Sequence, residues 1–348
     1  MKQDLNLDYP LDVDPKKIDA ILRDKRILIT GGSGALGNAL IKRLLEFNPK
    51  EIRVFSRDEK LQDLTKRKFT ANNIRYILGD VRDYHSIRDA VRSADIVIHA
   101  AAFKYLDLAE KQVTECIKTN VLGTINVLDA VKDERNVEIC LGISTDKASS
   151  PINIYGMSKA MTERLFCEAE SVKYDLKTKF ITARYGNVLM TTGSVVPKWK
   201  RAYESDEEIK VTDPKMTRFF FTLDDSIDLI FYALAHGLGG DIISTKMPHV
   251  ILGDLANIMS GGRVPVRTVG VRPGEKRHEC LIADFECKDA IDIGGRFVIR
   301  PHSGIGQMSE KGVKESFTSD KSKKLSDLET RDLLRKVGAF GKNNLSQE

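Results

Sequence analysis

A glycine-rich loop near the start of the sequence separates an apolar run from an amphipathic segment. Residues 26–30 form the apolar run, residues 31–37 carry glycines spaced Gly-x-x-Gly-x-x-Gly, and residues 38–47 have helical periodicity. Strand, glycine turn and helix in this order form the context in which a dinucleotide pyrophosphate binds at a helix N-terminus. The spacing differs from the Gly-x-Gly-x-x-Gly of ordinary dehydrogenases. We expect cofactor contacts from Gly31, Ser33, Gly34, Ala35, Leu36 and Gly37.

The alternation of strand and helix patterns continues to about residue 185. Strands that consist almost entirely of Val, Ile and Leu are buried on both faces, which is typical of a parallel sheet covered by helices. The sequence therefore predicts an α/β fold, a doubly wound parallel sheet of the Rossmann type with a smaller C-terminal substrate lobe. The predicted strands after the first are 51–56, 74–78, 95–102, 137–144 and 179–185, and the helices between them are 59–68, 84–91, 110–132 and 153–173.

Past residue 185 the alternation breaks, and this break sets the predicted domain boundaries. Residues 1–24 are expected to form an N-terminal arm with a short helix at 15–22. Residues 25–188 and 223–246 form the cofactor-binding domain, and residues 189–222 and 247–300 form the substrate lobe. Residues 301–348 are expected to be a polar tail with a late helix at 328–337. Ligands of open α/β sheets bind beyond the carboxyl ends of the strands, so we expect the lobe to cover that edge.

Composition excludes several classes of protein. The chain of 348 residues is 41% hydrophobic and 30% charged, with a formal charge of +5, which argues against global disorder. The one basic run, at residues 321–324, is read as a solvated segment rather than a nucleic-acid patch. Five cysteines without a CxxC pair, and histidines without an HExxH motif, predict a reducing compartment and no metal site. No stretch resembles a signal peptide or a membrane span, so we expect a cytoplasmic enzyme, a homo-oligomer, without membrane or nucleic-acid partners.

The ends of the second and third predicted strands bear on the choice of cofactor. An NAD site usually places an acidic residue at the end of the second strand for the ribose hydroxyls. This chain has Ser56 there, and the adjacent Arg57 and Lys60 suit a 2′-phosphate, so NADP is favoured over NAD. Asp58 or Glu59 remains available for a ribose, which keeps NAD as the alternative.

The end of the third strand adds two candidate cofactor residues. Asp80 and Val81 are expected near the adenine. For Asp80, capping of the helix that starts near Tyr84 is an equal alternative.

A cluster of titratable side chains follows the fifth predicted strand. Tyr155 and Lys159 are four residues apart on a predicted helix and therefore share one of its faces. An ammonium at this position lowers the pKa of the phenol and can hold a cofactor ribose. Thr145, at the end of the strand, can share the proton of a substrate hydroxyl. The alternative is that Tyr155 and Lys159 lie on an exposed helix face without function.

A series of short motifs runs through residues 25–300 in a fixed order. They include Ser-Thr-Asp-Lys at 144–147 and Arg-Pro-Gly-Glu-Lys at 272–276. The series resembles the extended short-chain dehydrogenase/reductases and, more narrowly, the inverting UDP-N-acetylglucosamine 4,6-dehydratases. The other motifs are residues 30–37, 55–59, 79–83, 99–104, 118–120, 151–153, 184–188, 193–197, 212–214 and 216–219.

The resemblance implies a reaction and a set of roles. In it, hydride leaves C4 of a UDP-sugar for the nicotinamide while Tyr155 takes the 4-hydroxyl proton; water is then eliminated across C5 and C6, and hydride returns to C6. The elimination needs a further acid and base. The resemblance assigns the C5 proton to Lys147 and the 6-hydroxyl to Asp146, although the two roles can be exchanged. Further cofactor contacts are expected from Ala100, Ala101 and Lys104, and substrate contacts from Lys104, Asn187, Val195, Arg218 and Arg272.

Several alternatives stay open at this point. Asp146 and Lys147 are otherwise read as a surface turn, and Arg218 as a guanidinium buried at a lobe interface. Departures from the family pattern at 190–192 and 243–245 leave the exact sugar undecided. A nucleotide-sugar epimerase on the same fold would keep Tyr155 and Lys159 without needing Asp146 and Lys147. A non-catalytic NADP-binding scaffold is the alternative outside enzymes.

Overall fold

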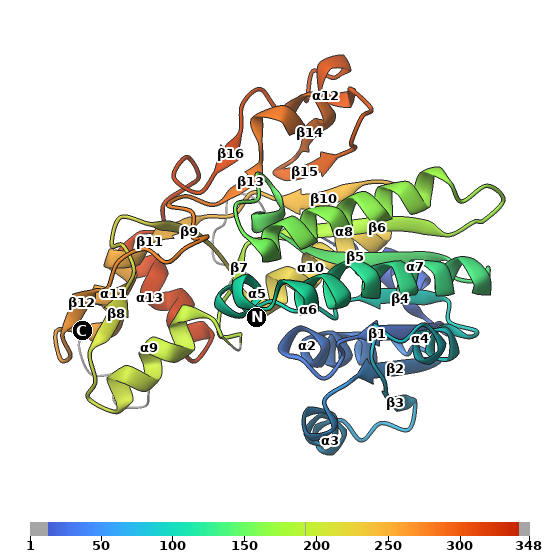
Figure 1. Ribbon diagram of the computed structural model, residues 1–348, viewed down its shortest axis with the longest axis horizontal. Coiled ribbons are helices and arrows are strands. Elements are labelled where there is room, and N and C mark those ends of the chain that lie inside the picture. The colour runs from blue at the N-terminus through green and yellow to red at the C-terminus, as the bar shows by residue number, and fades with distance from the viewer. Residues whose placement is uncertain (1–12, 192, 341–348) are drawn as a thin grey trace.

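The computed structural model describes residues 13–191 and 193–340, and its centre is a nine-stranded sheet (Figure 1). The strand order is β14-β15-β10-β6-β5-β4-β1-β2-β3. The seven strands from β10 to β3 are mutually parallel, and β15 and β14 extend the sheet in antiparallel fashion. The predicted α/β fold with a Rossmann-type parallel sheet is therefore confirmed. The strands are β1 Arg26–Thr30, β2 Glu51–Ser56, β3 Ile74–Leu78, β4 Ile96–His99, β5 Ile139–Thr145, β6 Lys179–Tyr185, β10 Ile242–Thr245, β14 Ala290–Ile293 and β15 Arg296–Ile299.

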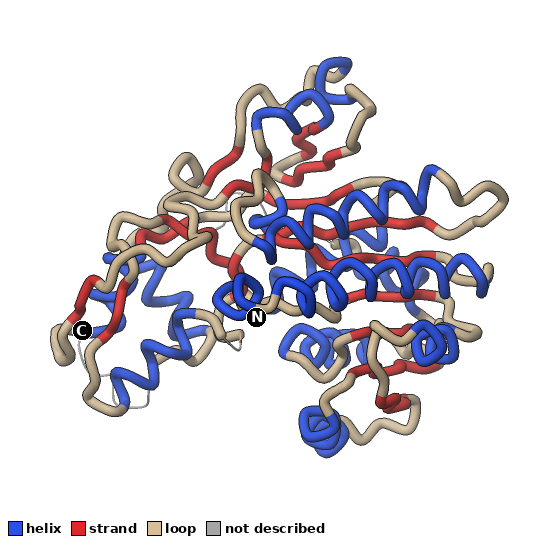
Figure 2. Tube along the Cα trace, viewed as in Figure 1, coloured by secondary structure: helices blue, strands red, loops and turns tan. Residues whose placement is uncertain are grey.

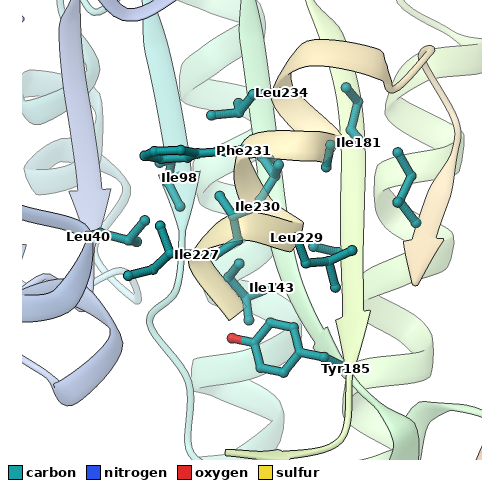
Figure 3. Close-up of a cluster of buried hydrophobic side chains, with 14 of the residues drawn as sticks. Leu40, Ile98, Ile143, Ile181, Tyr185, Ile227, Leu229, Ile230, Phe231 and Leu234 are labelled. Carbon is teal, nitrogen blue, oxygen red and sulfur yellow. The ribbon is translucent and has the colours of Figure 1, made fainter. Parts of the chain in front are cut away.

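Helices cover both faces of this sheet (Figure 2). Consecutive apolar residues of one strand point to opposite faces, so Ile27 and Ile29 join one core while Leu28 joins the other. The first core contains Leu40, Ile98, Ile227 and other side chains packed between the sheet and its helices (Figure 3). The helices on that face are α1 Pro15–Leu22, α2 Ala35–Leu44 and α10 Leu223–His236; those on the other are α4 Tyr84–Val91, α7 Gly123–Glu134 and α8 Ile154–Ser171.

The single helix predicted for residues 110–132 is wrong, because this segment is interrupted twice. Helix α5, Leu106–Lys111, ends at Gln112, whose backbone leaves the helical region with φ −128° and ψ 55°. Helix α6, Val113–Ile117, then runs through a π-helical turn, Lys118–Leu122, into α7. The apolar periodicity of the segment continues across both irregularities, so it did not reveal them.

A smaller lobe with its own apolar core lies beside the sheet, at the left of Figure 1. Segment 317–340, which the sequence analysis places in a tail, packs into the rest of the chain: β16 pairs with β13, and α13 packs against α11. The domain boundaries themselves stay a prediction. The elements of this region are β7 Asn187–Val188, α9 Val195–Glu204, β8 Ile209–Val211, β9 Thr217–Phe221, β11 His249–Ile251, α11 Leu252–Ser260, β12 Val266–Thr268 and α13 Asp327–Lys336. The strands β13 Cys280–Ile282 and β16 Phe317–Thr318 instead pack against the first core.

Two lysines of the basic run pair with carboxylates of the chain. Lys321 pairs with Glu315 at 2.7 Å and Lys324 with Asp254 at 2.7 Å. The charges of these two lysines therefore face carboxylates of the chain itself.

The predicted arm lies partly outside the described residues, which begin at residue 13. Helix α1 forms where it was predicted and packs Ile18 and Leu22 into the first core, with α10 as its neighbour. The apolar face of α1 therefore packs against the chain itself. The oligomeric state stays a prediction. Within residues 13–191 and 193–340, no helix combines the length and apolar character needed to cross a lipid bilayer.

A buried ion cluster joins three elements behind the carboxyl end of β5. The guanidinium of Arg184 on β6 contacts Glu163 of α8 at 2.6 Å and Glu286 at 2.7 Å. It also donates a hydrogen bond to the carbonyl of Leu281 on β13 at 2.8 Å. Arg184, Glu163 and Glu286 are 1%, 3% and 5% exposed, so the cluster is closed to solvent and fixes α8 and β13 against the sheet.

Candidate active site

A cavity of about 540 Å³ opens where the parallel strands end, between the sheet and the smaller lobe. It extends from the glycine loop after β1 to the ends of β5 and β6, which is the position at which open α/β sheets bind ligands. No group of three or more His, Cys, Asp or Glu side chains in the described part of the chain is arranged to hold a metal ion.

Glycines shape the end of the cavity next to β1. Gly31 has φ +70°, and a Cβ there would lie 2.8 Å from the Cα of Ala101. A Cβ on Gly37 would lie 2.2 Å from the carbonyl oxygen of Gly32, so only glycine lets α2 pack this closely. Gly34 precedes α2, and no side chain caps the first N–H groups of that helix. These backbone donors at the cavity fit the phosphates of a dinucleotide.

The end of β2 presents Ser56 and Arg57 to the cavity, whereas Lys60 is not among the lining residues. Asp58 is engaged as the N-cap of helix α3, Glu59–Lys68, where its carboxylate accepts a hydrogen bond from the N–H of Leu61 at 2.9 Å. Asp58 also lines the cavity, so it stays a candidate for a ribose contact, whereas Glu59 is not among the lining residues.

At the end of β3, Asp80 lines the cavity and pairs with Arg57 at 3.8 Å and with Arg82 at 2.6 Å. The alternative that Asp80 caps α4 is wrong, because Asp83 performs this role and accepts a hydrogen bond from the N–H of His85 at 3.0 Å. Asp80 is therefore available to position Arg57 at the cavity.

Tyr155 and Lys159 lie in the first turns of α8, which starts after the N-cap Asn153. Both line the cavity together with Thr145 at the end of β5. Burial raises the pKa of Tyr155 to about 12, and Lys147 and a hydrogen bond with Thr145 oppose this rise. The cation that acts on the phenol is thus Lys147, whereas the sequence analysis assigned this effect to Lys159. Burial lowers the pKa of Lys159 to about 8.

Asp146 and Lys147 form a hydrogen-bonded pair rather than an exposed turn. Asp146 is fully buried; its Oδ1 accepts hydrogen bonds from the Thr145 hydroxyl at 2.9 Å and from Lys147 Nζ at 3.0 Å. Lys147 lines the cavity, and its Nζ also contacts Asn187 Oδ1 at 3.2 Å and Glu279 Oε1 at 3.1 Å. Lys147 is therefore the member of the pair that faces a ligand, and Asp146 lies behind it.

The predicted substrate residues divide into two groups. Lys104, Asn187 and Arg272 line the cavity, and Arg272 is held by Asp107 at 3.1 Å and by Glu275 at 2.5 Å. Burial lowers the pKa of Lys104. The other predicted cofactor residues, Ala35, Leu36, Val81, Ala100 and Ala101, line the cavity as well.

Val195 and Arg218 are not among the lining residues. The Arg218 guanidinium donates hydrogen bonds to the carbonyls of Thr217 and Arg277 and lies 3.7 Å from Glu279, which matches its alternative reading as a buried interface residue. A substrate role for Val195 or Arg218 remains a prediction from resemblance.

Several side chains at the site were not predicted from the sequence. Lys198 of α9 and Tyr105 line the cavity, and Glu279 contacts Lys147. Lys198 lies four residues after Ser194, one helical turn into α9. This spacing only weakly indicates that the Lys198 side chain faces the cavity. Glu279 directly precedes the apolar strand β13, and nothing in the residues around it indicates that this loop reaches β5. Of the departures noted at 190–192, residue 192 lies outside the described residues.

Comparison with known proteins identifies the family. The family described as "Polysaccharide biosynthesis protein" matches residues 27–301, and the chain belongs to it. The chain is 39% identical over 307 residues to a "UDP-N-acetylglucosamine 4,6-dehydratase (inverting)" of Campylobacter jejuni, covering 84% of this chain and 91% of the relative. It is 37% identical over 327 residues to a "UDP-glucose 4-epimerase" of Rickettsia prowazekii, covering 89% and 95%.

Among solved structures, Pen from Bacillus thuringiensis is similar to this chain with a TM-score of 0.87 and 32% identity, covering 92% of this chain and 99% of Pen. The resemblance to nucleotide-sugar dehydratases of the extended short-chain dehydrogenase/reductase type, inferred from the motifs, is thereby confirmed. The family includes both nucleotide-sugar dehydratases and epimerases.

Two glycines with similar backbone angles test whether the close approach of Gly193 to Tyr105 shapes the cavity. Gly193 has φ +88°, and a Cβ there would lie 2.4 Å from the ring of Tyr105; Gly270 has φ +91° with no atom within 4 Å of the same position. Both substitutions to Ala carry a left-handed backbone cost of about 1–2 kcal/mol. We predict that Gly193→Ala also displaces Tyr105 and weakens nucleotide binding in calorimetry, whereas Gly270→Ala lowers only the melting temperature. Equal affinities for the two variants would show that the approach of Gly193 to Tyr105 does not shape the nucleotide site.

Proposed function

We propose that this protein is an NADP-dependent UDP-N-acetylglucosamine 4,6-dehydratase that forms a UDP-2-acetamido-2,6-dideoxy-4-keto-hexose with inversion at C5. The observation that carries the proposal is the Asp146–Lys147 pair, in which Asp146 accepts a hydrogen bond from Thr145 and Lys147 faces the same cavity as Tyr155. Tyr155 and Lys159 suffice for hydride transfer. A second acid/base pair beside them is what an elimination requires.

The cavity fits a dinucleotide because Gly31 and Gly37 leave no room for a Cβ and the first N–H groups of α2 are not capped by a side chain. A bound oxidised nicotinamide supplies a hydride acceptor and a positive charge that lowers the pKa of Tyr155. Tyr155 takes the proton of the 4-hydroxyl, and Thr145 shares the hydrogen bond to that oxygen. Lys159, which stays largely protonated below its pKa of about 8, holds a ribose hydroxyl and orients the cofactor.

Elimination follows at the Asp146–Lys147 pair. The ammonium of Lys147 passes one proton to Asp146 across their 3.0 Å hydrogen bond, which leaves a neutral amine and a neutral acid. The amine takes the C5 proton, made acidic by the 4-keto group, and the proton held by Asp146 goes to the departing 6-hydroxyl. Asp146 does not line the cavity, so this proton travels through Thr145 or Lys147, both within hydrogen-bond distance of Asp146 Oδ1.

The nucleotide diphosphate is assigned to the lobe side of the cavity. Arg272 and Lys198 line it there, and guanidinium and ammonium groups bind phosphates by charge-assisted hydrogen bonds. Asp107 and Glu275 hold the Arg272 side chain before ligand arrives, which reduces the entropy lost on binding.

A UDP-glucose 4-epimerase is the second candidate, and the relative from Rickettsia prowazekii favours it. An epimerase needs hydride transfer at C4 but no proton transfer at C5. The buried Asp146–Lys147 pair would have no chemical task in that reaction, so the geometry favours the dehydratase.

Incubation with UDP-N-acetylglucosamine in deuterated water distinguishes the two reactions. We expect the product to have lost water and to carry deuterium at C5 from the solvent, with the inverted C5 configuration in NMR spectra. A product of unchanged mass without deuterium would show an epimerase, and retained C5 configuration would contradict inversion. UDP-glucose serves as the parallel substrate.

The preference for NADP is assigned to Arg57, which lines the cavity beside Ser56 and is positioned by Asp80. Removing a charged hydrogen-bond donor costs about 1.5–3 kcal/mol, so Arg57→Ala should weaken NADP binding about 10–100-fold and leave NAD binding unchanged. Lys60→Ala is the matched control because Lys60 does not line the cavity. Calorimetric titration with both cofactors tests this. If wild type prefers NAD, the assignment of cofactor is wrong.

A further inference from the structure

A second carboxylate contacts Lys147 from a part of the chain far away in sequence. Glu279 directly precedes β13 and is 2% exposed. Its Oε1 lies 3.1 Å from Lys147 Nζ, almost the same distance as Asp146 Oδ1. Lys147 is therefore bracketed by two buried carboxylates, one adjacent in sequence and one supplied by the loop before β13.

The contacts of Lys147 use the full capacity of its ammonium group. An ammonium donates three hydrogen bonds, and Nζ has three acceptors: Asp146 Oδ1, Glu279 Oε1 and Asn187 Oδ1. The second oxygens of both carboxylates, Asp146 Oδ2 and Glu279 Oε2, are buried and have no hydrogen-bond partner among the described residues. Each carboxylate thus directs one oxygen to Lys147, and its other oxygen has no hydrogen-bond partner among the described residues.

The two carboxylates differ in their other neighbours. Glu279 faces three cations, because Arg218 and Lys276 act on it in addition to Lys147. Asp146 accepts its hydrogen bonds from Thr145 and Lys147, and the negative charge of Glu279 repels its ionised form. The charge of Asp146 in turn acts on Tyr155 and Lys276. The surroundings therefore favour the ionised form of Glu279 and oppose the ionised form of Asp146.

We propose that Glu279 is a positioning residue of the elimination site that, together with Asp146 and Asn187, fixes Lys147 Nζ at the cavity and acts as its permanent counter-ion. Once the Lys147 amine has taken the C5 proton it is again an ammonium, while Asp146 still holds its own proton. At that stage Glu279 is the carboxylate that balances the charge of Lys147. The inference rests on the proposed dehydratase function, for which it adds a third member to the Asp146–Lys147 pair.

The direction of the pH effect follows from the charges. Burial and Glu279 raise the pKa of Asp146, while Lys147 opposes them. Asp146 and Glu279 raise the pKa of Lys147 despite its burial, and the three cations lower the pKa of Glu279 although burial opposes them. Removing the charge of Glu279 lowers both the pKa of Asp146 and the pKa of Lys147. The pKa values of Asp146 and Lys147 each set one limb of the pH profile for elimination. Both limbs must therefore move to lower pH when the charge of Glu279 is removed.

Glu279→Gln tests this, since it keeps an acceptor oxygen and removes the charge. We expect both limbs of the pH profile for water elimination to move down by about one unit or more. The rate of C4 oxidation, seen as transient reduced cofactor, should stay within twofold because Glu279 is not among the groups that shift Tyr155. Glu170→Gln is the control: this carboxylate pairs with Lys173 and accepts a hydrogen bond from the N–H of Phe180 at the start of β6, the end of that strand opposite to Arg184. A profile of Glu279→Gln that superimposes on wild type would overturn the proposal.

A second readout does not need the substrate. The rate at which acetic anhydride acylates Lys147 follows the neutral fraction of its amine, so a pKa lowered by one unit raises that rate about tenfold at fixed neutral pH. We expect this rise in Glu279→Gln and not in Glu170→Gln or Glu279→Asp, measured by peptide mass spectrometry on folded protein.

The two readouts separate two kinds of failure. If wild type does not dehydrate UDP-N-acetylglucosamine but acylation of Lys147 rises as expected, the proposed function is wrong and the role of Glu279 stands. If wild type dehydrates the substrate and acylation does not change, the role of Glu279 is wrong. If Glu279→Gln fails to fold, Glu279→Asp replaces it in the test. The charge is kept, so the two limbs of the pH profile stay in place. The elimination rate falls because the shorter side chain no longer reaches Lys147.

Discussion

The buried guanidinium of Arg184 holds together the parts of the molecule on which the site depends. It connects β6 with Glu163 of α8, which carries Tyr155 and Lys159, and with Glu286 and the Leu281 carbonyl of β13. Glu279 directly precedes β13, so the position of this carboxylate relative to β5 depends on the same contacts. Breaking a buried ion pair by removing one partner is strongly destabilising, because a charge is left without compensation in the interior. This cluster explains how a loop distant in sequence can place a carboxylate 3.1 Å from Lys147.

The site itself concentrates charge in a region closed to solvent. The Lys147 ammonium lies within hydrogen-bond distance of both Asp146 and Glu279, and Arg218 lies 3.7 Å from Glu279. Such an arrangement is costly for folding unless every charge is compensated, and two carboxylate oxygens lack a partner among residues 13–191 and 193–340. Groups with opposed pKa shifts that share one proton are typical of acid/base chemistry. In the proposed elimination Asp146 Oδ2 can receive a proton, whereas Glu279 stays ionised.

The sequence predicted what depends on neighbours along the chain. The glycine loop, the alternation of elements and the contiguous Thr145, Asp146 and Lys147 each have a local physical cause, and the spacing of Tyr155 and Lys159 is a property of one helix. Contacts between distant segments were not accessible in this way. Glu279 joins the site, and Arg218 faces Glu279 instead of the cavity, because of how the lobe packs against β5 and β9. The break at Gln112 and the packing of segment 317–340 into the rest of the chain likewise depend on tertiary contacts that override the local pattern.

The central claim is that Tyr155 and Lys159 move hydride while Lys147 and its two carboxylates eliminate water. Mixing Lys147→Met with NADP and UDP-N-acetylglucosamine, and following both the ultraviolet absorbance of reduced nicotinamide and the mass of the sugar, tests it most directly. We predict that reduced cofactor accumulates and that no water is lost, because elimination stops while C4 oxidation proceeds, more slowly than in wild type since Tyr155 loses the cation that lowers its pKa. Loss of water at the wild-type rate in Lys147→Met would contradict it.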